Sequence, residues 1–345
     1  MLRAALFGLA LAAAACQLPG IDRQRLPEAL IAVHYRTPEE VRARDQAWEA
    51  RLAAQPGRAA VRNAAGRGGR LPHLDEFRGL LGRVLGRPAA RERASSGGLA
   101  LLDPRSGELR RVESVARGAV PQAWSADRKR LLYRVDDGSR VQLWELELAS
   151  ERVRPLTRGS RSHPEGCYAG QGRLVVTVLD HSRDPLRSWI ALTGPGGRGP
   201  YQMLSEGPAD HSPSCSPDGR RVVWVDEARP GRPQLRGRLL EEGSALRQLP
   251  AGMGPTFSPD GRWLVFSARS GEYWRLWRLR SDGTARAPLG SRGLDALAPS
   301  VSPDGLFVVF VASPQPPHRL LRVAAFAGDA EVLLPVEGEA DSPVW

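Results

Sequence analysis

The sequence has almost no lysine and no long apolar segment after its first fifteen residues, and these shortages exclude several classes of protein. Lys129 is the only lysine among 49 basic residues, and the net charge is +11. No RNA-binding aromatic motif, zinc-finger spacing or basic zipper accompanies this charge, so we expect no nucleic-acid partner. The arginines are scattered, which is typical of a GC-rich genome, although an anionic partner is the alternative interpretation. No later segment is apolar enough to cross a membrane.

The one long apolar run lies at the N-terminus and predicts a lipoprotein signal. Residues 4–15 are apolar after a short basic start, and this run is too short to span a bilayer as a mature helix. It ends in Ala-Ala-Ala-Cys16, which resembles the bacterial lipobox, in which the cysteine receives a lipid. We interpret residues 1–15 as a signal peptide and Cys16 as the lipidation site; the alternative is an ordinary cleavage site. Gln17 favours an outer-membrane lipoprotein of the bacterial cell envelope, facing the periplasm and held by its lipid.

An internal repeat organises the rest of the chain. Three segments share the sequence Ser-Pro-Asp-Gly followed by a short apolar run, two more are degenerate, and a sixth stops before its turn. The apolar residue ahead of each turn is called here its marker residue. The six marker residues are Trp124, Cys167, Cys215, Phe257, Val301 and Trp345. Their spacings of 43, 48, 42, 44 and 44 residues are typical of four-stranded propeller blades.

The chemistry of the repeated motif supports this interpretation. Pro presets φ, Asp can accept a hydrogen bond from the backbone ahead of it, and Gly takes the positive φ that closes a tight turn. The apolar run that follows suits a strand buried on both faces. The pattern resembles the WD40-like Pro-Asp repeat of the TolB family of periplasmic propellers, over residues 96–345. That resemblance implies recognition of a protein through a propeller face, with envelope lipoproteins or Tol-Pal-like components as partners.

The repeat also predicts how the ring closes. The last inner strand, residues 341–345, has no second strand after it, and residues 98–113 read as two outer strands with no motif before them. Residues 30–35 could supply the missing second strand. We therefore predict an all-β, six-bladed β-propeller whose N- and C-terminal strands share the closing blade.

The segment between the signal and the propeller differs in character. Residues 16–95 are predicted to be a short helical and linker segment. The sequence Thr-Pro-Glu-Glu at 37–40 matches a helix-capping box, with a helix to follow. Residues 56–70 are rich in Gly, Arg and Ala and indicate a linker, and residues 74–85 predict a second amphipathic helix. This segment could pack on the rim of the propeller or serve as a docking segment near the membrane.

Catalytic and metal-binding motifs are scarce. None of the six histidines forms a metal-ligand pair at helical spacing, and no Gly-x-Ser-x-Gly elbow or phosphate loop is present. We therefore expect no catalytic residue, no metal and no cofactor. Some serine peptidases carry a similar propeller followed by an α/β-hydrolase domain. Because this sequence ends inside the closing blade, we expect a protein that is not an enzyme.

The two later cysteines hold the same repeat position in neighbouring blades. An oxidising compartment permits a disulfide between Cys167 and Cys215. Equivalent positions of adjacent inner strands are nonetheless expected to lie beyond the roughly 7 Å Cα separation that a disulfide spans. We expect two small buried thiols.

Five polar residues are predicted to gather on one face of the propeller. In an antiparallel blade, the start of the first strand and the loop after the second strand lie on the same side. His163, His211 and Asp341 each precede a marker residue by four positions, and Asp180 and His181 fall in a loop after a second strand. We predict that they surround one mouth of the central channel, a usual place for ligands; the alternative is solvent-exposed loop histidines.

Three functions are compatible with such a face. The first is recognition of another envelope protein, without catalysis. The second is binding of a small molecule or glycan at the channel mouth, and the third is a lyase or hydrolase that uses carboxylate and His groups in the channel.

Overall fold

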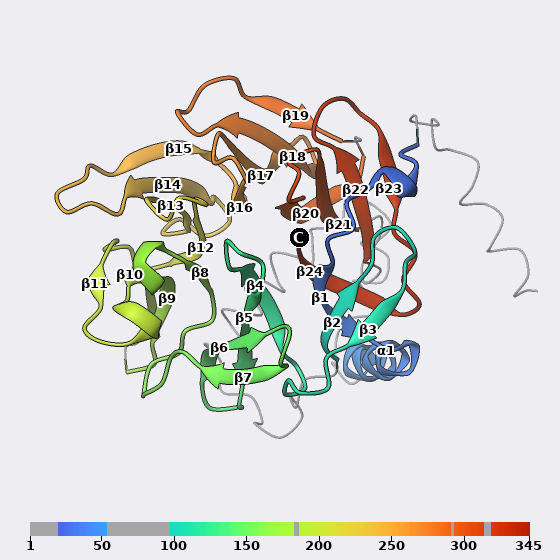
Figure 1. Ribbon diagram of the computed structural model, residues 1–345, viewed down its shortest axis with the longest axis horizontal. Helices are drawn as coiled ribbons and strands as arrows, with labels where there is room; N and C mark the ends of the chain where they lie inside the picture. The colour runs from blue at the N-terminus through green and yellow to red at the C-terminus, as the bar shows by residue number, and fades with distance from the viewer. Residues whose placement is uncertain (1–19, 54–96, 183–185, 291–292, 314–318) are drawn as a thin grey trace, which may run out of the picture.

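The strands form six four-stranded sheets around a common centre, which confirms the predicted six-bladed propeller (Figure 1). The computed structural model describes residues 20–53, 97–182, 186–290, 293–313 and 319–345. Neighbouring strands within each blade run antiparallel. In five blades the strands follow chain order from the centre outward, with blade 2 reading β8 to β11 from inside to outside.

The strand bounds are as follows. Blade 1 has β4 (Val120–Trp124), β5 (Arg130–Asp136), β6 (Val141–Glu147) and β7 (Arg152–Pro155). Blade 2 has β8 (Gly166–Tyr168), β9 (Leu174–Asp180), β10 (Arg187–Leu192) and β11 (Gln202–Met203). Blade 3 has β12 (Asp210–Cys215), β13 (Arg221–Asp226), β14 (Gln234–Leu239) and β15 (Arg247–Ala251). Blade 4 has β16 (Met253–Phe257), β17 (Trp263–Ser270), β18 (Tyr273–Arg280) and β19 (Ala287–Leu289). Blade 5 has β20 (Asp295–Val301), β21 (Phe307–Ser313), β22 (Leu320–Ala325) and β23 (Glu331–Leu333).

The closing blade joins the two ends of the described chain. Its order is β24 (Glu339–Val344), β1 (Ile31–Arg36), β2 (Gly98–Leu102) and β3 (Leu109–Arg111). The predicted second strand from residues 30–35 is therefore confirmed. The Trp345 indole packs in the same cluster as Leu102 and donates from Nε1 to the Ala29 carbonyl at 2.9 Å. These contacts tie the C-terminal strand to the N-terminal one.

One α-helix and three short 3-10 helices complete the described chain. The α-helix is α1 (Pro38–Ala53), and the 3-10 helices are η1 (Arg23–Arg25), η3 (Gly170–Gly172) and η4 (Pro195–Gly197). The predicted capping box is present: Glu40 N donates to Thr37 Oγ1 at 3.2 Å, and Thr37 N donates to Glu40 Oε2 at 2.9 Å. The predicted linker at 56–70 and helix at 74–85 lie outside the described residues.

The hydrophobic core lies in the seams between blades. Second strands are apolar on both faces because each face packs against a neighbouring blade, as in Val308 to Ala312, which are all buried. One seam cluster brings Val225 of blade 3 against Phe257 and Phe266 of blade 4. Burying each large apolar side chain contributes about 1.5–3 kcal/mol, so the seams are what hold the blades in a ring.

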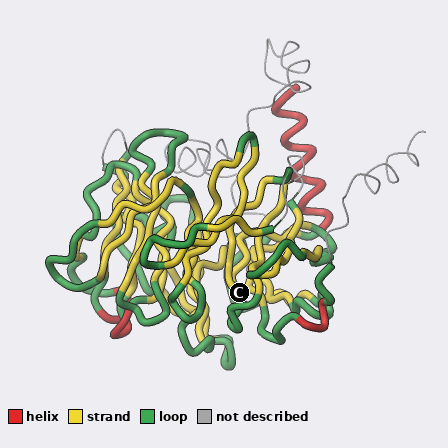
Figure 2. Tube along the Cα trace, turned by 90° about the horizontal axis from the view of Figure 1, so that it is seen from above, coloured by secondary structure: helices red, strands yellow, loops and turns green. Residues whose placement is uncertain are grey.

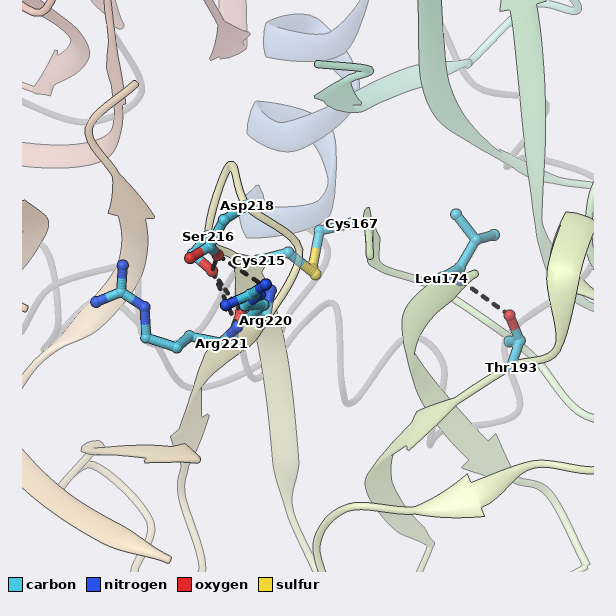
Figure 3. The surroundings of a disulfide bond; sticks show 8 residues. All are labelled: Cys167, Leu174, Thr193, Cys215, Ser216, Asp218, Arg220 and Arg221. Carbon is cyan, nitrogen blue, oxygen red and sulfur yellow. Dashed lines mark hydrogen bonds between the residues drawn. A yellow bond between two sulfur atoms is a disulfide. The ribbon is translucent and has the colours of Figure 1, made fainter. Parts of the chain in front are cut away.

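The Ser-Pro-Asp-Gly motifs form the expected turns. In blade 3, Asp218 Oδ1 accepts from the Ser216 hydroxyl and from Arg220 N, and Gly219 has φ of +65°. Figure 3 shows these contacts beside the disulfide. The same Ser–Asp contact recurs in blades 4 and 5. Local chemistry therefore sets the reversal between the first two strands of each blade.

The propeller has two faces, which we name by what each carries. The turn face carries the Ser-Pro-Asp-Gly turns. The helix face carries the loops that lead into each inner strand and the loops from second to third strands. Because α1 lies between β1 and β2, it belongs to the helix face, and Figure 2 shows it rising beyond the strands on one side.

The expectation of two free thiols was wrong, because Cys167 and Cys215 form a disulfide with a Cα–Cα distance of 5.7 Å (Figure 3). The inner strands of blades 2 and 3 approach each other closely because the turn of blade 2 has Gly170 where the repeated motif has aspartate. Gly170 N donates to Gly219 O at 3.2 Å, and a Cβ on Gly219 would lie 2.3 Å from Gly170 N. Because both residues are glycines, the two turns can come close enough for the disulfide to form between the blades.

Candidate functional site

The predicted histidines lie on the helix face but are mostly buried. His163, in the loop before β8, is 1% exposed, and its ring is hydrogen bonded through Nδ1 to Gln142 Oε1 at 3.1 Å and through Nε2 to the Tyr201 hydroxyl at 2.9 Å. Burial and the neighbouring Arg161 lower the pKa of His163 to about 4. At neutral pH the ring is uncharged, and both of its nitrogens already have partners.

His181 is hydrogen bonded to Ser162, the residue that precedes His163 in the chain. The His181 Nε2 is hydrogen bonded to Ser162 Oγ at 2.7 Å, and that hydroxyl also accepts from Val141 N at 3.0 Å. Burial and the positive Arg140 lower the pKa of His181. The structure thus brings two of the predicted residues together at the seam of blades 1 and 2.

Asp180 has a local structural role at the end of β9. Its Oδ1 accepts from the backbone N of Ser182 at 3.0 Å and from the Ser182 hydroxyl at 2.6 Å. These two bonds turn the chain after β9 and so position the loop that carries His181.

His211 lies in a separate cluster between blades 2 and 3. It is 3% exposed, with Nε2 3.4 Å from Glu227 Oε2 and Nδ1 hydrogen bonded to Ser212 Oγ at 3.0 Å. Ser212 also donates from its backbone N to Glu165 Oε2 of the neighbouring blade at 2.5 Å. Burial raises the pKa of the adjacent Asp210. Together these groups join the two inner strands at the helix face.

Asp341 is the centre of a charged cluster in the closing blade. Its Oδ2 accepts from Arg36 Nη1 and from Arg319 Nη1, both at 2.8 Å. Burial alone would raise the pKa of this carboxyl, but Arg319, His34 and Arg36 hold it well below its usual range. Arg36 also pairs with Glu339 at 3.0 Å. We call this cluster, with Asp341, Arg36, Arg319 and Glu339, the closing clasp.

The five predicted residues therefore share a face but do not converge on one point. The alternative of solvent-exposed histidines does not hold for His163 and His211, which are buried. Among the described residues, no group of three or more His, Cys, Asp or Glu side chains could hold a metal ion. That the face binds a partner stays a prediction.

Sequence reasoning missed a repeated backbone bulge that shapes this face. Three residues before the marker residue, the chain adopts positive φ in four blades, directly ahead of a proline. These residues are Ser212, Gly254, Ala298 and Ser342. Positive φ is unusual for a residue that is not glycine, and the residue before proline normally prefers extended backbone. The bulge turns the Ser212 amide towards Glu165. In the sequence, the only sign of the bulge is the residue pair X-Pro that recurs at this position of each of the four blades.

Comparison with known proteins shows which of them this propeller resembles. No protein-family model matches the chain. Over 164 residues it is 29% identical to the Tol-Pal system protein TolB of Anaeromyxobacter dehalogenans, a match that covers 46% of this chain and 37% of that protein. TolB from Acinetobacter baumannii superposes with a TM-score of 0.62 at 20% identity, over 74% of this chain and 64% of that chain. The chain is a TolB-like six-bladed β-propeller.

A second solved structure agrees with this conclusion. A structure assigned to TolB from Agrobacterium tumefaciens superposes on the TolB-like propeller with a TM-score of 0.54 at 20% identity, over 66% of this chain and 84% of that chain. The chain spans about a third of the length of its curated relatives. Propellers of this shape also occur in a solved peptidase structure, so the architecture alone does not decide between binding and catalysis.

The first described residues of the TolB-like propeller lie beside blade 5. Gly20 forms a bridge with Glu331 in β23, and Ile21 N donates to Glu331 O at 3.4 Å. The predicted lipidation site Cys16 and the signal at 1–15 lie outside the described residues. In the part of the chain that is described, no helix is both long and apolar enough to cross a bilayer.

Proposed function

We propose that this TolB-like propeller is a non-catalytic protein of the bacterial cell envelope that binds another envelope protein through its helix face. The curated relatives are named as proteins of the Tol-Pal system, which supports an envelope role of this kind. The proposed partner is an envelope protein or lipoprotein.

The observation that carries the proposal is a helix fixed on the same face as the polar clusters. Arg44 in α1 pairs with Glu339 of the closing clasp, and Glu40 accepts from Gly97 N at 3.1 Å and lies 3.5 Å from Arg111. An isolated helix of 16 residues is marginal in water, so these contacts stabilise its position. A helix held in place loses little conformational freedom on binding, which favours its use in recognition.

The polar groups of the helix face suit recognition better than acid–base catalysis. A general acid or base needs a proton-transfer atom within reach of substrate. Both ring nitrogens of His163 are engaged, and the Asp341 carboxylate is shared by two arginines. These contacts hold a rigid surface, and rigidity reduces the entropic cost of association.

The same proposal includes a lipid anchor at Cys16. Four extended residues reach at most about 14 Å, so the lipid would lie within that distance of Gly20 at the outer edge of blade 5. Substituting Cys16→Ser should abolish incorporation of labelled palmitate and release the protein from the detergent phase. Cys167→Ser is the matched control and should leave labelling unchanged. Labelled Cys16→Ser protein would contradict this part of the proposal.

The partner is tested by co-purification from solubilised envelopes of the native host. Arg42 is exposed on α1, whereas Arg152 is exposed on the outer strand β7 of blade 1. Arg42→Glu should lose a partner that the wild type and Arg152→Glu both retain, with all three proteins melting within about 2 °C of one another. Equal recovery with all three proteins, or no stable protein partner, would overturn the proposal.

A further inference from the structure

A cavity of about 440 Å³ opens on the turn face, at the seam between blades 4 and 5. Two consecutive Ser-Pro-Asp-Gly turns form its sides, contributing Asp260 from blade 4 and Asp304 from blade 5. Trp263 and Phe326 form an aromatic wall. The cavity lies on the opposite face from α1, so it is independent of the helix-face proposal above.

The aromatic wall is held in place from within the protein. The rings of Trp263 and Phe326 meet edge to face, with centroids 6.0 Å apart and planes at 73°. The Arg278 guanidinium lies 5.1 Å from the Trp263 centroid and 5.4 Å from that of Phe326, and its Nη1 donates to the Phe326 carbonyl at 2.6 Å. A wall fixed in this way needs little reorganisation to receive a ligand.

The two carboxylates at the sides each use one oxygen for the turn. Oδ1 of Asp260 accepts from Ser258 and from Arg262 N, and Oδ1 of Asp304 accepts from Ser302 and from Leu306 N. Burial would raise the pKa of Asp260, but these hydrogen bonds and the Arg262 charge lower it. Both side chains are exposed. Oδ2 of Asp260 lies 3.9 Å from Arg262 Nε, whereas Asp304 forms no ion pair with another of the described residues. Because Arg262, Arg278 and Arg280 also lie at this seam, Asp304 is the carboxylate that can pair with an incoming cation.

The neighbouring seam, between blades 3 and 4, repeats this geometry. A Cβ on Gly261 of the blade 4 turn would lie 3.6 Å from Pro217 of the blade 3 turn. In the same way, a Cβ on Gly305 of the blade 5 turn would lie 4.0 Å from Pro259 of the blade 4 turn. The Pro and Gly of neighbouring turns therefore approach one another in the same way at both seams.

The residue that begins the second strand differs between these seams, as does the residue after the third strand, which is Ser281 in blade 4 and Phe326 in blade 5. In the blade 3–4 seam, Arg221 Nη2 donates to the Gly261 carbonyl at 2.9 Å, and its guanidinium lies 5.5 Å from the Phe257 ring centroid. In blade 4 the residue at the position of Arg221 is Trp263, six residues after the marker residue in both cases. The blade 4–5 seam therefore has an aromatic wall where its neighbour has an arginine.

The glycine carbonyl oxygens of these turns also differ in their hydrogen-bond donors. Gly219 O of blade 3 accepts from Gly170 N at 3.2 Å, and Gly261 O of blade 4 accepts from Arg221. For Gly305 O of blade 5, no hydrogen-bond donor is found among the residues that the structure describes. An acceptor, two carboxylates and an aromatic wall thus border one cavity.

We propose that the cavity between blades 4 and 5 binds the guanidinium of an arginine side chain presented by a partner polypeptide. A guanidinium is planar and carries five donors, so it can bond the Gly305 carbonyl and an aspartate while stacking on an aromatic ring. In the neighbouring seam of this same chain, Arg221 bonds the equivalent Gly261 carbonyl and lies over a different ring, that of Phe257. Lysine offers a point charge without the planar fork and fits less well.

The test uses the full mature chain and two peptides in isothermal titration calorimetry. The probes are acetyl-Ala-Arg-Ala-amide and the same peptide with citrulline, which keeps the planar shape but removes the charge. We expect the arginine peptide to bind with a Kd in the range of about 0.1–1 mM, and the citrulline peptide to bind at least tenfold more weakly. Affinity for the arginine peptide should fall as salt is raised.

Three variants locate the site. Asp304→Asn should weaken binding by about three- to tenfold, whereas the matched Asp218→Asn in the blade 3 turn should leave it unchanged. Trp263→Arg introduces into the cavity the residue that blade 3 already uses, and it should abolish peptide binding. The Asn side-chain oxygen can accept the same turn hydrogen bonds as Asp304. Asp304→Asn therefore still tests the site if Trp263→Arg does not fold. Equal binding of both peptides, equal effects of the two Asn variants, or no binding at 5 mM peptide would overturn the proposal.

Discussion

Neutralising Asp341 should destabilise the propeller far more than neutralising an exposed carboxylate with the same bond. Asp341→Asn removes the charge shared by Arg36 and Arg319, whose side chains are 19% and 20% exposed, while Asp341 is 8% exposed. Removing one partner of a buried ion pair costs about 3–5 kcal/mol. Because Arg36 keeps Glu339, we expect the lower end, about 3 kcal/mol of unfolding free energy.

The matched control is Glu151→Gln. Glu151 accepts from Arg110 at 2.8 Å, the same distance as in the closing clasp, but these side chains are 41% and 55% exposed. An exposed pair contributes about 0–1 kcal/mol, so this variant should unfold close to the wild type. Asp341→Asn should lower the melting temperature by about 4–5 °C, given an unfolding entropy of about 2.1 cal/mol/K per residue for a chain of this size.

The pH dependence gives the sign of the effect. The folded pKa of Asp341 is depressed below the unfolded value of 3.8, so its stabilisation is complete above that value and is lost as the pH falls towards the folded pKa. The difference between wild type and Asp341→Asn should therefore be full at pH 7 and shrink below about pH 4. Urea unfolding of the two proteins at pH 7 and at a pH below about 4 measures this difference in unfolding free energy. A difference at pH 7 no larger than that of Glu151→Gln would refute the reasoning.

Three further predictions concern other elements. Reducing the Cys167–Cys215 disulfide, which closes a separation of 48 residues, should cost about 4 kcal/mol, and a double Cys→Ala variant should melt at one temperature with or without reductant. Gly219→Ala should destabilise by more than 2 kcal/mol because its Cβ would collide with the Gly170 backbone, whereas Gly243→Ala, also at positive φ but in open space, should cost only about 1 kcal/mol in urea titrations. The pKa of His163 is about 4, below the unfolded 6.5, so wild-type stability should fall by about 3 kcal/mol from pH 6.5 to 4, and His163→Gln should flatten that part of the profile; an unchanged slope would contradict the assignment.

The architecture was predictable because each turn carries its information locally. Asp218 and Gly219 close their turn through contacts within a few residues, so the motif and its period identify the blades without knowledge of the fold. The closing blade followed from counting strands, since residues 98–113 needed an inner partner.

The details of the candidate site depend on approaches that no local pattern encodes. The disulfide exists because Gly170 meets Gly219 across a seam, a contact between residues 49 positions apart in different blades. The depth of His163 and the pairing of Arg36 with Asp341 likewise depend on how neighbouring blades pack. The order of the strands was enough to predict the face of the ring on which these groups lie. Their burial and their hydrogen-bond partners depend on the packing of neighbouring blades, which the sequence pattern does not encode.

The central claim, that the helix face binds another envelope protein, is tested most directly by photo-crosslinking in living cells of the native host. A photoreactive amino acid replaces Gln46, exposed on α1, or Arg152, exposed on the outer edge of blade 1. The account predicts a discrete protein adduct, identified by mass spectrometry, from position 46 and none from position 152. Adducts from position 152 alone, or the same adducts from both positions, would contradict it.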